Sequence, residues 1–279
     1  MELTPARSSV KIPRATGAVV AASVAGGVLT LLVAIWQSGP VRVDERQWII
    51  AAAMGVLVLG SWIRPVVVYR EGESEAFNMD EAFFVILALL VPPLVTLGTL
   101  ALATVTAQAA RRRPLVKSAF NAGQVVIAAG LGISVSRGIA APTASLTPVQ
   151  VSAVMLGVAV YCVVNTLLVA GVLASMGTSW RELTGDLPIQ VALAGAGALI
   201  GVVLALAIQA HPWVLTLAVP GLIVQRRLIS ARFAALHDHT RMKGLYEVTL
   251  EANRGCGTRQ CSTRSWSRYD GCFAVPKPP

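Results

Sequence analysis

Long apolar runs follow one another along almost the entire chain, separated by short polar segments. The runs cover residues 16–36, 48–69, 82–91, 94–110, 115–136, 149–176, 188–210 and 212–225. Most of them reach about 20 residues, which at 1.5 Å per residue matches the roughly 30 Å hydrocarbon core of a bilayer. Their apolar residues are uninterrupted rather than alternating with polar ones. The pattern predicts an all-α fold, a polytopic membrane helix bundle of about eight spans or half-spans.

The third and fourth runs belong to one uncharged stretch that is too long for a single simple span. Residues 82–110 would measure about 43 Å as one helix, and Pro92-Pro93 interrupts them. A single span would also place the basic group Arg111, Arg112, Arg113 and Lys117 outside the cell, against the positive-inside rule. We therefore expect two short helices, 82–91 and 94–110, that meet at the proline pair as a hairpin and need not cross fully.

Basic residues flank the first and the last spans and set the expected orientation. They lie in segment 1–15 and directly after the last run: Arg7, Lys11, Arg14, Arg226 and Arg227. Because Lys and Arg anchor cytoplasmic loops, both termini are expected in the cytoplasm. His211-Pro212 then forms a turn on the outside between spans 188–210 and 212–225. We expect a multi-pass protein of the bacterial cell (inner) membrane.

Composition and charge exclude other classes of protein. The chain is 55% hydrophobic and 13% charged, with a mean hydropathy of +0.67, whereas soluble domains are about a quarter charged. The net charge is +9, but the basic residues flank apolar runs instead of gathering on one face, so no nucleic-acid partner is expected. Three of the four Cys crowd into the last residues and do not form a secreted disulfide framework. The expected partner is the lipid bilayer, and self-association is left open.

Three amides within the spans are the candidate ligand-binding residues. Asn121 and Gln124 lie three apart on one face of the fifth span, and Asn165 lies mid-span in the sixth. They form either a pocket between helices or interhelical hydrogen bonds, and we favour the second because amides pair readily in lipid. Gly197 and Gly201 have the spacing of a close helix contact, which we interpret as packing within the bundle rather than a dimer face.

No catalytic or metal site is expected. The only clear charge within a span is Arg64, near the end of the second run, where it is expected to snorkel to the interface. The chain has no phosphate-binding loop, no zinc-protease motif and no nucleophile elbow. His237-Asp238 resembles the ligand pair of HD phosphohydrolases but lacks its further His and Asp partners. We therefore expect no enzyme activity, no metal and no cofactor.

Residues 226–254 have apolar positions near helical spacing and predict a cytoplasmic juxtamembrane helix that leaves the membrane. Two segments carry a family resemblance: RRRPLVKSAFNAGQ at 111–124, and LYEVTLEANRGCGT at 245–258. They resemble the multi-span membrane regions of bacterial, especially actinobacterial, signalling proteins that precede GAF, GGDEF, EAL or HD-type output domains. The second segment resembles the helix entering a GAF-type module. No output-domain motif follows, so the catalytic residues of those families have no matching positions here.

The last residues, 255–279, change composition abruptly. From Gly257 on they contain no Leu, Ile or Met, while Cys, Ser, Arg and Trp crowd together. In a GC-rich gene, reading each codon one nucleotide earlier from Cys261 would turn most of these residues into apolar ones on an amphipathic helix. We expect a disordered tail, produced by a frameshift near Arg259 that truncated a longer signalling protein. A genuine Cys/Arg-rich tail stays open, because the amino-acid sequence does not reveal the codons.

Two functions follow from these features. The first is a sensory or anchoring membrane region of a signal-transduction protein, which would bias an output domain that handles cyclic dinucleotides. The alternative is a small-molecule uptake component or transporter, with the Pro92-Pro93 hairpin and the three amides around a pocket near the midplane. The predicted exit helix and tail favour the first function, because a transporter has no need of them. The ligand is unknown in either case.

Overall fold

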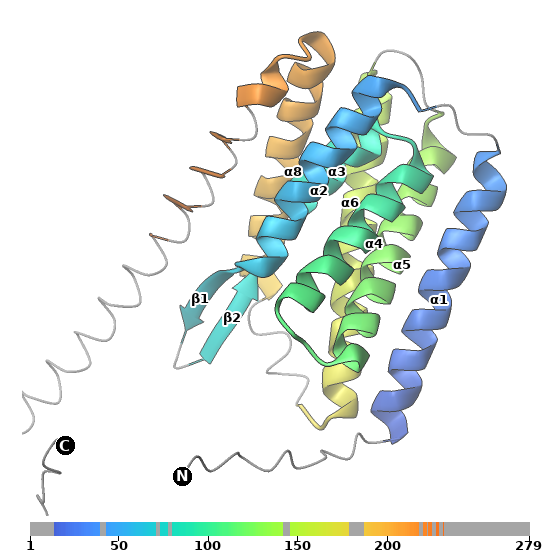
Figure 1. The fold of residues 1–279 in the computed structure, drawn as a ribbon, viewed down its shortest axis with the longest axis vertical. Coiled ribbons are helices and arrows are strands. Elements are labelled where there is room, and N and C mark those ends of the chain that lie inside the picture. Colours follow the sequence, from blue (N-terminus) through green and yellow to red (C-terminus); the bar gives the residue numbers. More distant parts are fainter. Residues whose placement is uncertain are drawn as a thin grey trace, which may run out of the picture. The chain divides into compact units, whose positions relative to one another are not determined.

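The computed structural model describes residues 14–39, 43–70, 73–77, 80–141, 146–178 and 187–217, with isolated positions between 220 and 231. The chain divides into two units. The first comprises Met1–Val67 with Ala76–Arg227, and the second comprises Val68–Glu75 with Leu228–Pro279. All the helices described below belong to the first unit (Figure 1).

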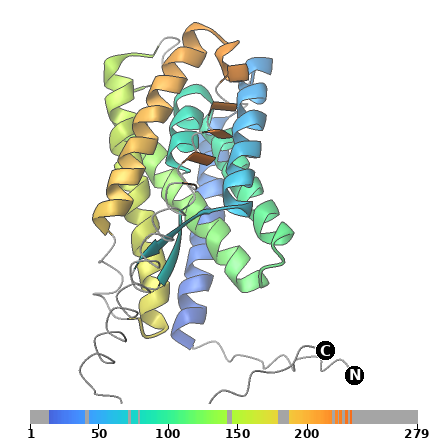
Figure 2. The ribbon, with the colours of Figure 1, turned by 90° about the vertical axis from the view of Figure 1, so that its left-hand side faces the viewer.

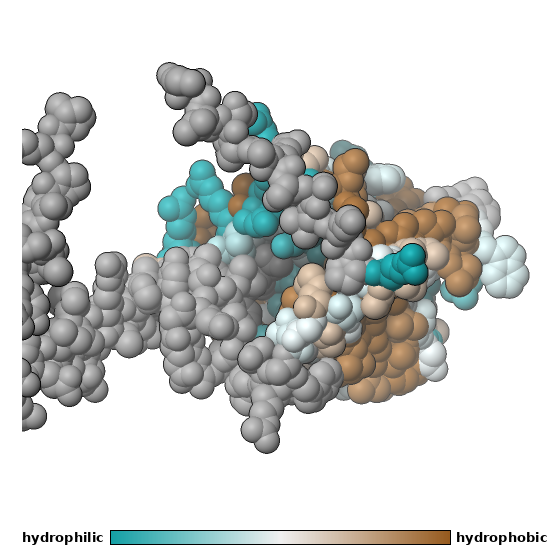
Figure 3. Space-filling model, turned by 90° about the horizontal axis from the view of Figure 1, so that it is seen from below, coloured by the Kyte–Doolittle hydropathy of each residue, from teal (hydrophilic) through white to brown (hydrophobic). Residues whose placement is uncertain are grey.

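The first unit is a bundle of apolar helices. They are α1 (Arg14–Ser38), α2 (Glu45–Ile63), α3 (Glu81–Leu90), α4 (Pro93–Ala110), α5 (Leu115–Ile139), α6 (Pro148–Ser175) and α8 (Leu187–Ala210). Six of them are long and apolar enough to cross a membrane, and α3 is a shorter apolar helix. The helical fold class is thus confirmed, and the chain has the architecture of a multi-pass membrane protein. Seen from the end at which α1 begins, apolar side chains gather on one part of the surface and hydrophilic ones on another (Figure 3).

Local sequence signals explain where several helices begin. The Asp44 carboxylate accepts the backbone N–H of Gln47, and the Gln47 side chain accepts the N–H of Asp44, which forms a capping box at α2. Thr147 and Gln150 form the same motif at α6. Pro93 opens α4, where its missing N–H and fixed φ suit the first helical position. The helix break at Pro92-Pro93 therefore lies where the sequence predicts it.

The predicted second span, 48–69, is wrong in its last part. α2 ends at Ile63, and two short strands, β1 (Val66–Arg70) and β2 (Glu73–Phe77), form a two-stranded sheet. Pro65 explains the end of the helix, because proline removes a backbone donor and disfavours helical conformation at the residue before it. The β-branched run Val66–Val68 then favours an extended conformation. β2 lies entirely within the polar segment between the predicted runs 48–69 and 82–91.

Hydrogen bonds between helix ends define the two ends of the bundle. Thr16 and Ser175 hydroxyls lie 2.9 Å apart, joining the start of α1 to the end of α6. At the opposite end, an Arg46 guanidinium nitrogen donates to the carbonyl of Ile208 over 2.6 Å, and the Leu146 N–H donates to Gln209 Oε1 over 3.2 Å. α1, α5 and α8 run from the first of these ends to the second, whereas α2, α4 and α6 run in the opposite direction (Figures 1 and 2).

The short helix α3 lies at the centre and α1 at the edge. Residues Ala82 to Leu87 are all buried, and α3 packs against α2, α4, α6 and α8. α1 packs mainly on α5 and leaves most of its apolar side chains exposed, with Leu32 56% and Leu29 61% accessible. The expected hairpin is thus present in the form of α3 and α4, with α3 too short to cross a bilayer.

Glycines allow the closest helix contacts. A Cβ at Gly201 of α8 would lie 2.6 Å from the backbone oxygen of Ala82 in α3, so only glycine fits without a shift. A Cβ at Gly123 of α5 would lie 2.5 Å from the backbone oxygen of Ser23 in α1. The interpretation of Gly197 and Gly201 as packing positions within the bundle agrees with this geometry.

Several predicted segments fall on residues that the structure describes only in part. In the predicted eighth span, 212–225, Val214 to Leu217 are helical, together with isolated later positions. The predicted juxtamembrane helix 226–254 has only isolated described positions, and the tail 255–279 lies outside the described residues, as does most of segment 1–15.

Candidate functional site

Two adjacent carboxylates lie where the central helix α3 begins. Asp80 is 8% exposed and precedes the helix, and Glu81, half-buried, is its first residue. Both carboxylates fall in the polar segment between the predicted runs 48–69 and 82–91, and the prediction that Arg64 is the only clear charge within a span is wrong. Arg64 follows the last residue of α2 and is exposed, whereas Asp80 is enclosed by the bundle.

Tyr161 of α6 binds the first of these carboxylates. Its hydroxyl donates to Asp80 Oδ2 over 2.6 Å, and the tyrosine is 1% exposed. The Tyr161 ring stacks on Phe84 of α3, with ring centroids 4.8 Å apart and planes 15° apart. The hydrogen bond and the stacking together hold the first turn of α3 against α6.

The cluster lies deep in the bundle. Tyr161 lies near the middle of α6, about 20 Å along the helix axis from either end. The Glu81 carboxylate lies beside Gly197, which is close to the middle of α8: a Cβ at Gly197 would be 3.8 Å from Glu81 Oε2. Two helices therefore place the carboxylates near mid-depth, independently of each other.

Helix capping does not explain Asp80. Asp at the start of a helix usually accepts a backbone N–H of the first turn, but the Asp80 side chain makes no such bond and accepts the Tyr161 hydroxyl instead. Within the part of the chain that the structure describes, no Lys or Arg pairs with Asp80 or Glu81. Buried carboxylates without a cation are costly, since burial removes their hydration.

This arrangement places two carboxyl groups, which supply hydrogen-bond acceptors and can carry negative charge, at one point inside a membrane bundle. It can bind a proton, a small cation or a protonated amine. The described residues contain no group of three or more His, Cys, Asp or Glu side chains that could chelate a metal ion.

The three predicted amides are brought together only in part. Gln124 Nε2 donates to Asn165 Oδ1 over 2.6 Å, joining α5 to α6. Gln124 is 3% exposed, and Asn121 is not part of this bond. None of the three lines the cavity between α2 and the turn after α8 or the cavity between α1, α4 and α5. The bond has the form of the interhelical pairing that we favoured, and a ligand role for these amides stays a prediction.

The predicted topology anchors gather at one end of the bundle. Arg111 follows α4 and donates to the Trp62 carbonyl over 3.1 Å, which ties the end of α4 to the end of α2. Arg112, Arg113 and Lys117 lie beside it, and Arg14 opens α1 at the same end. Arg227 is exposed, and Arg226 lies outside the described residues.

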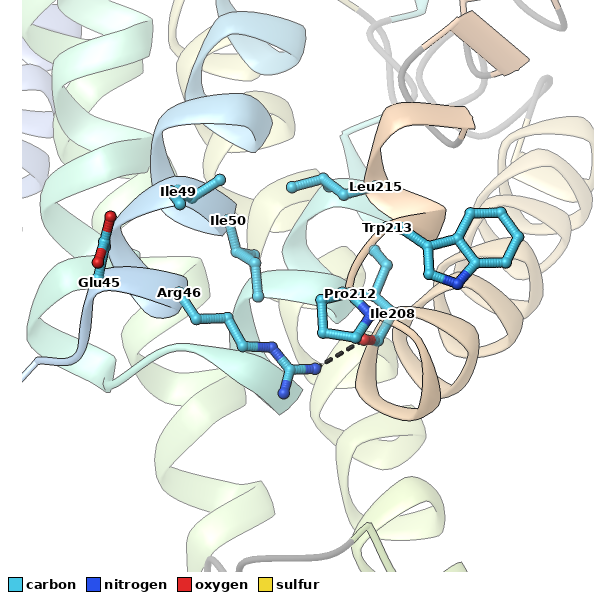
Figure 4. A pocket seen from close by; sticks show the side chains of 8 residues that line it. All are labelled: Glu45, Arg46, Ile49, Ile50, Ile208, Pro212, Trp213 and Leu215. Carbon is cyan, nitrogen blue, oxygen red and sulfur yellow. Dashed lines mark hydrogen bonds between the residues drawn. The ribbon is translucent and has the colours of Figure 1, made fainter.

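A cavity of about 480 Å³ lies at the opposite end, between α2 and the turn after α8. Figure 4 shows Arg46 reaching toward Ile208 and Pro212, with Trp213 directed away from it. Arg46 donates to the carbonyls of Ile208 and Gln209, which lie in the last turn of α8. A cation at a helix C-terminus stabilises its free carbonyls, so the charged group of this cavity already has a structural role.

One sequence signal could have identified the acidic site. The run AFFVILALL at 82–90 is apolar on every face, and a helix that is hydrophobic all round is buried. A helix too short to cross and buried on all sides begins inside the bundle, so the polar residues at its start lie there too. The sequence does not indicate which residue pairs with Asp80, because Tyr161 comes 81 positions later in the chain.

No protein-family model, no curated protein and no solved structure matches this chain. The resemblance to bacterial signalling proteins therefore rests on the two segments 111–124 and 245–258 alone.

Proposed function

We propose that the chain is a membrane-embedded binding component whose ligand is a small cation or protonated amine held by Asp80 and Glu81, and that it acts as the sensory membrane region of a signal-transduction protein. The observation that carries the proposal is the buried Asp80–Tyr161 pair at the start of a half-helix near mid-depth. Ionisable groups inside a membrane bundle are expensive and are found at functional sites.

The neighbours of the pair support a ligand rather than a purely structural role. A structural link between α3 and α6 needs one carboxylate for the Tyr161 hydroxyl, and Asp80 supplies it. Glu81 adds a second negative charge beside the first. It lies against Gly197, the smallest residue possible, so the α8 backbone leaves space next to this carboxylate. A positive ligand would offset the charge of both.

A transport function is the second candidate, and one observation favours it. Helices that begin at mid-depth, with polar groups at their broken ends, form the substrate sites of many transporters. α3 begins in this way between α6 and α8. A sensor and a transporter would share this binding site and differ in whether the ligand crosses the bilayer.

Ligand binding is tested with the full chain in lipid nanodiscs. Its melting temperature is measured against increasing sodium, ammonium, ethanolamine and spermidine, because a ligand that binds the folded state raises the melting temperature in a saturable way. We expect at least one of these cations to do so. Glu81→Gln keeps the side-chain shape and removes the charge, so it should abolish the shift.

Glu45→Gln is the matched control. It removes an acidic side chain that is exposed at the start of α2, away from the cluster, and should leave the shift unchanged. Equal shifts in the wild type and in Glu81→Gln, or no saturable shift with any of the four cations, would contradict the proposed site. Flux of the binding cation into proteoliposomes would select the transporter, and binding without flux the sensor.

We also propose that the end bearing Arg14 and Arg111–Arg113 is cytoplasmic, in a bacterial cell membrane, because basic residues concentrate there. In a variant whose four cysteines are replaced by serine, Lys117→Cys should resist a membrane-impermeant thiol reagent in intact cells. Gly39→Cys, after the opposite end of α1, should react. The reverse labelling pattern would overturn this orientation.

We further propose that the chain has no catalytic activity of its own. The described hydroxyl that bonds to a carboxyl group, that of Tyr161, is 1% exposed and so closed to a substrate, and His237-Asp238 lies outside the described residues. Turnover of GTP or a cyclic dinucleotide by the purified chain, lost on changing His237 and Asp238 to Ala, would refute this.

A further inference from the structure

A second cavity, of about 370 Å³, lies between α1, α4 and α5. It is separate from the acidic cluster, since its lining comes from the last turns of α1 and α5 and the first turns of α4. These turns lie at the end of the bundle opposite Arg111. The cavity therefore lies where the bundle meets one face of the bilayer.

The cavity is apolar inside and polar at its mouth. Leu97 and Ile133 form part of its floor and are 2% and 6% exposed. Two polar residues line its outer part. Gln37 is the last residue but one of α1, and Arg137 lies two residues before the end of α5. From Arg137 to Gly130, the innermost α5 residue of the lining, the distance along the helix is about 10 Å.

Arg137 brings a positive charge that none of the described residues pairs with. Among the residues that the structure describes, no carboxylate pairs with its guanidinium, which is exposed. The hydroxyls of the wall are already bonded: Thr30 and Ser134 donate to carbonyls of their own helices, at Gly26 and Gly130. Arg46, in the cavity of Figure 4, differs because it is bound to α8 carbonyls.

We propose that this cavity binds one anionic phospholipid, with the lipid phosphate on Arg137 and an acyl chain along the apolar floor between α1 and α5. An Arg guanidinium binds phosphate with two parallel hydrogen bonds, and Gln37 supplies an additional amide donor at the mouth. A water-soluble anion would pair with Arg137 but leave the apolar floor empty. The combination of a cation at the mouth and an apolar floor fits an amphiphile.

The depth of the site agrees with this ligand. Arg137 lies in the last turn of a 25-residue helix, which is longer than the hydrocarbon core requires, so its charge reaches the headgroup region. Leu131 and Leu29 of the lining lie further in and are 46% and 61% exposed. An acyl chain can therefore enter the groove from the surrounding lipid without crossing a polar barrier.

The test uses the full chain in nanodiscs that contain a photo-crosslinkable phosphatidylglycerol with a diazirine in its acyl chain. We expect the label on peptides containing Leu29–Val33 and Leu131–Ser134. Arg137→Gln should lower labelling of these peptides about fivefold, the effect of one basic residue at a charged lipid surface. Ser134→Phe, which leaves Arg137 in place and fills the groove, should lower it as well.

Arg113→Gln is the matched control, because it removes a basic residue at the opposite end of the bundle and should leave this labelling unchanged. Excess unlabelled phosphatidylglycerol should compete with the probe, whereas glycerol phosphate should not. Labelling of Arg137→Gln at the wild-type level would overturn the proposal. Competition by glycerol phosphate as strong as that by the lipid would also overturn it and indicate a site for a free anion.

Discussion

α1 and α3 are both apolar helices, yet they have opposite surroundings. α1 has 25 residues, of which few are buried, and it packs mainly on α5. α3 has ten residues, of which six consecutive ones are buried, and it packs against four helices. Hydropathy measures only the preference for an apolar medium, and both lipid and protein provide one. The comparison shows that α3, which is too short to count as a membrane span, lies in the core.

The difference extends to the polar residues. The hydroxyls of Ser23, Thr30 and Ser38 in α1 donate to carbonyls of the same helix, which satisfies them without another element. Asp80 and Glu81 at the start of α3 cannot be satisfied in this way and depend on α6 and α8 for their surroundings. Function is therefore expected at α3, and lipid contact at α1.

Truncating one aromatic side chain in α3 and one in α1 should give the largest difference in unfolding free energy. Phe84→Ala removes a ring that is 1% exposed and stacked on Tyr161. We expect the unfolding free energy to fall by about 3 kcal/mol. This is the low end of the range for replacing a buried Phe by Ala, because the unfolded chain in a membrane is also surrounded by apolar groups. Trp36→Ala in α1, where the side chain is 83% exposed, should change stability little. Equal losses, measured by denaturant unfolding in micelles, would contradict a central α3.

Crowding the contact between α3 and α8 should have the next largest effect. Gly201→Val places a Cβ 2.6 Å from the Ala82 carbonyl oxygen and 2.9 Å from Val85 Cβ, and we expect a loss of about 2 kcal/mol. Gly195→Val in the same helix has no neighbour within 4 Å and serves as the control. A tolerated Gly201→Val would mean that α8 does not pack closely on α3.

The overall helical plan could be predicted from the sequence because it depends on run length, prolines and charge, which are local. The break at Pro92-Pro93 and the start of α6 at Pro148 are examples. The end of α2 was misassigned because the apolar run continues through Val66–Tyr69, where Pro65 and β-branched residues change the conformation without changing hydropathy. The apolar run 82–90 could have indicated the acidic site, but its neighbours Tyr161 and Gly197 could not be predicted, because contacts between α3, α6 and α8 are not contained in any local pattern.

Crowding the α1 contact should have a smaller effect on the bundle. Gly123→Leu places a Cβ 2.5 Å from the Ser23 backbone oxygen, so α1 must move away from α5. Because α1 contributes little to the core, we expect about 1 kcal/mol of lost stability together with increased labelling of Ser23→Cys by a thiol reagent that enters the bilayer. Gly138→Leu in α5 has no neighbour within 4 Å and is the control. Unfolding of the whole bundle by Gly123→Leu would assign α1 to the core.

The smallest expected effect concerns the amides between α5 and α6, which lie neither at the edge nor beside α3. A double-mutant cycle of Gln124→Leu and Asn165→Leu isolates the bond from Gln124 Nε2 to Asn165 Oδ1. Interhelical hydrogen bonds in membranes contribute about 0.6 kcal/mol, because the unfolded chain also finds partners in lipid, so we expect a coupling of about this size. A coupling well above about 1.7 kcal/mol would exceed what such pairing supplies. The cation-induced rise in melting temperature depends on Glu81, so neither single substitution should remove it. Loss of this rise in Gln124→Leu would instead assign these amides to ligand binding.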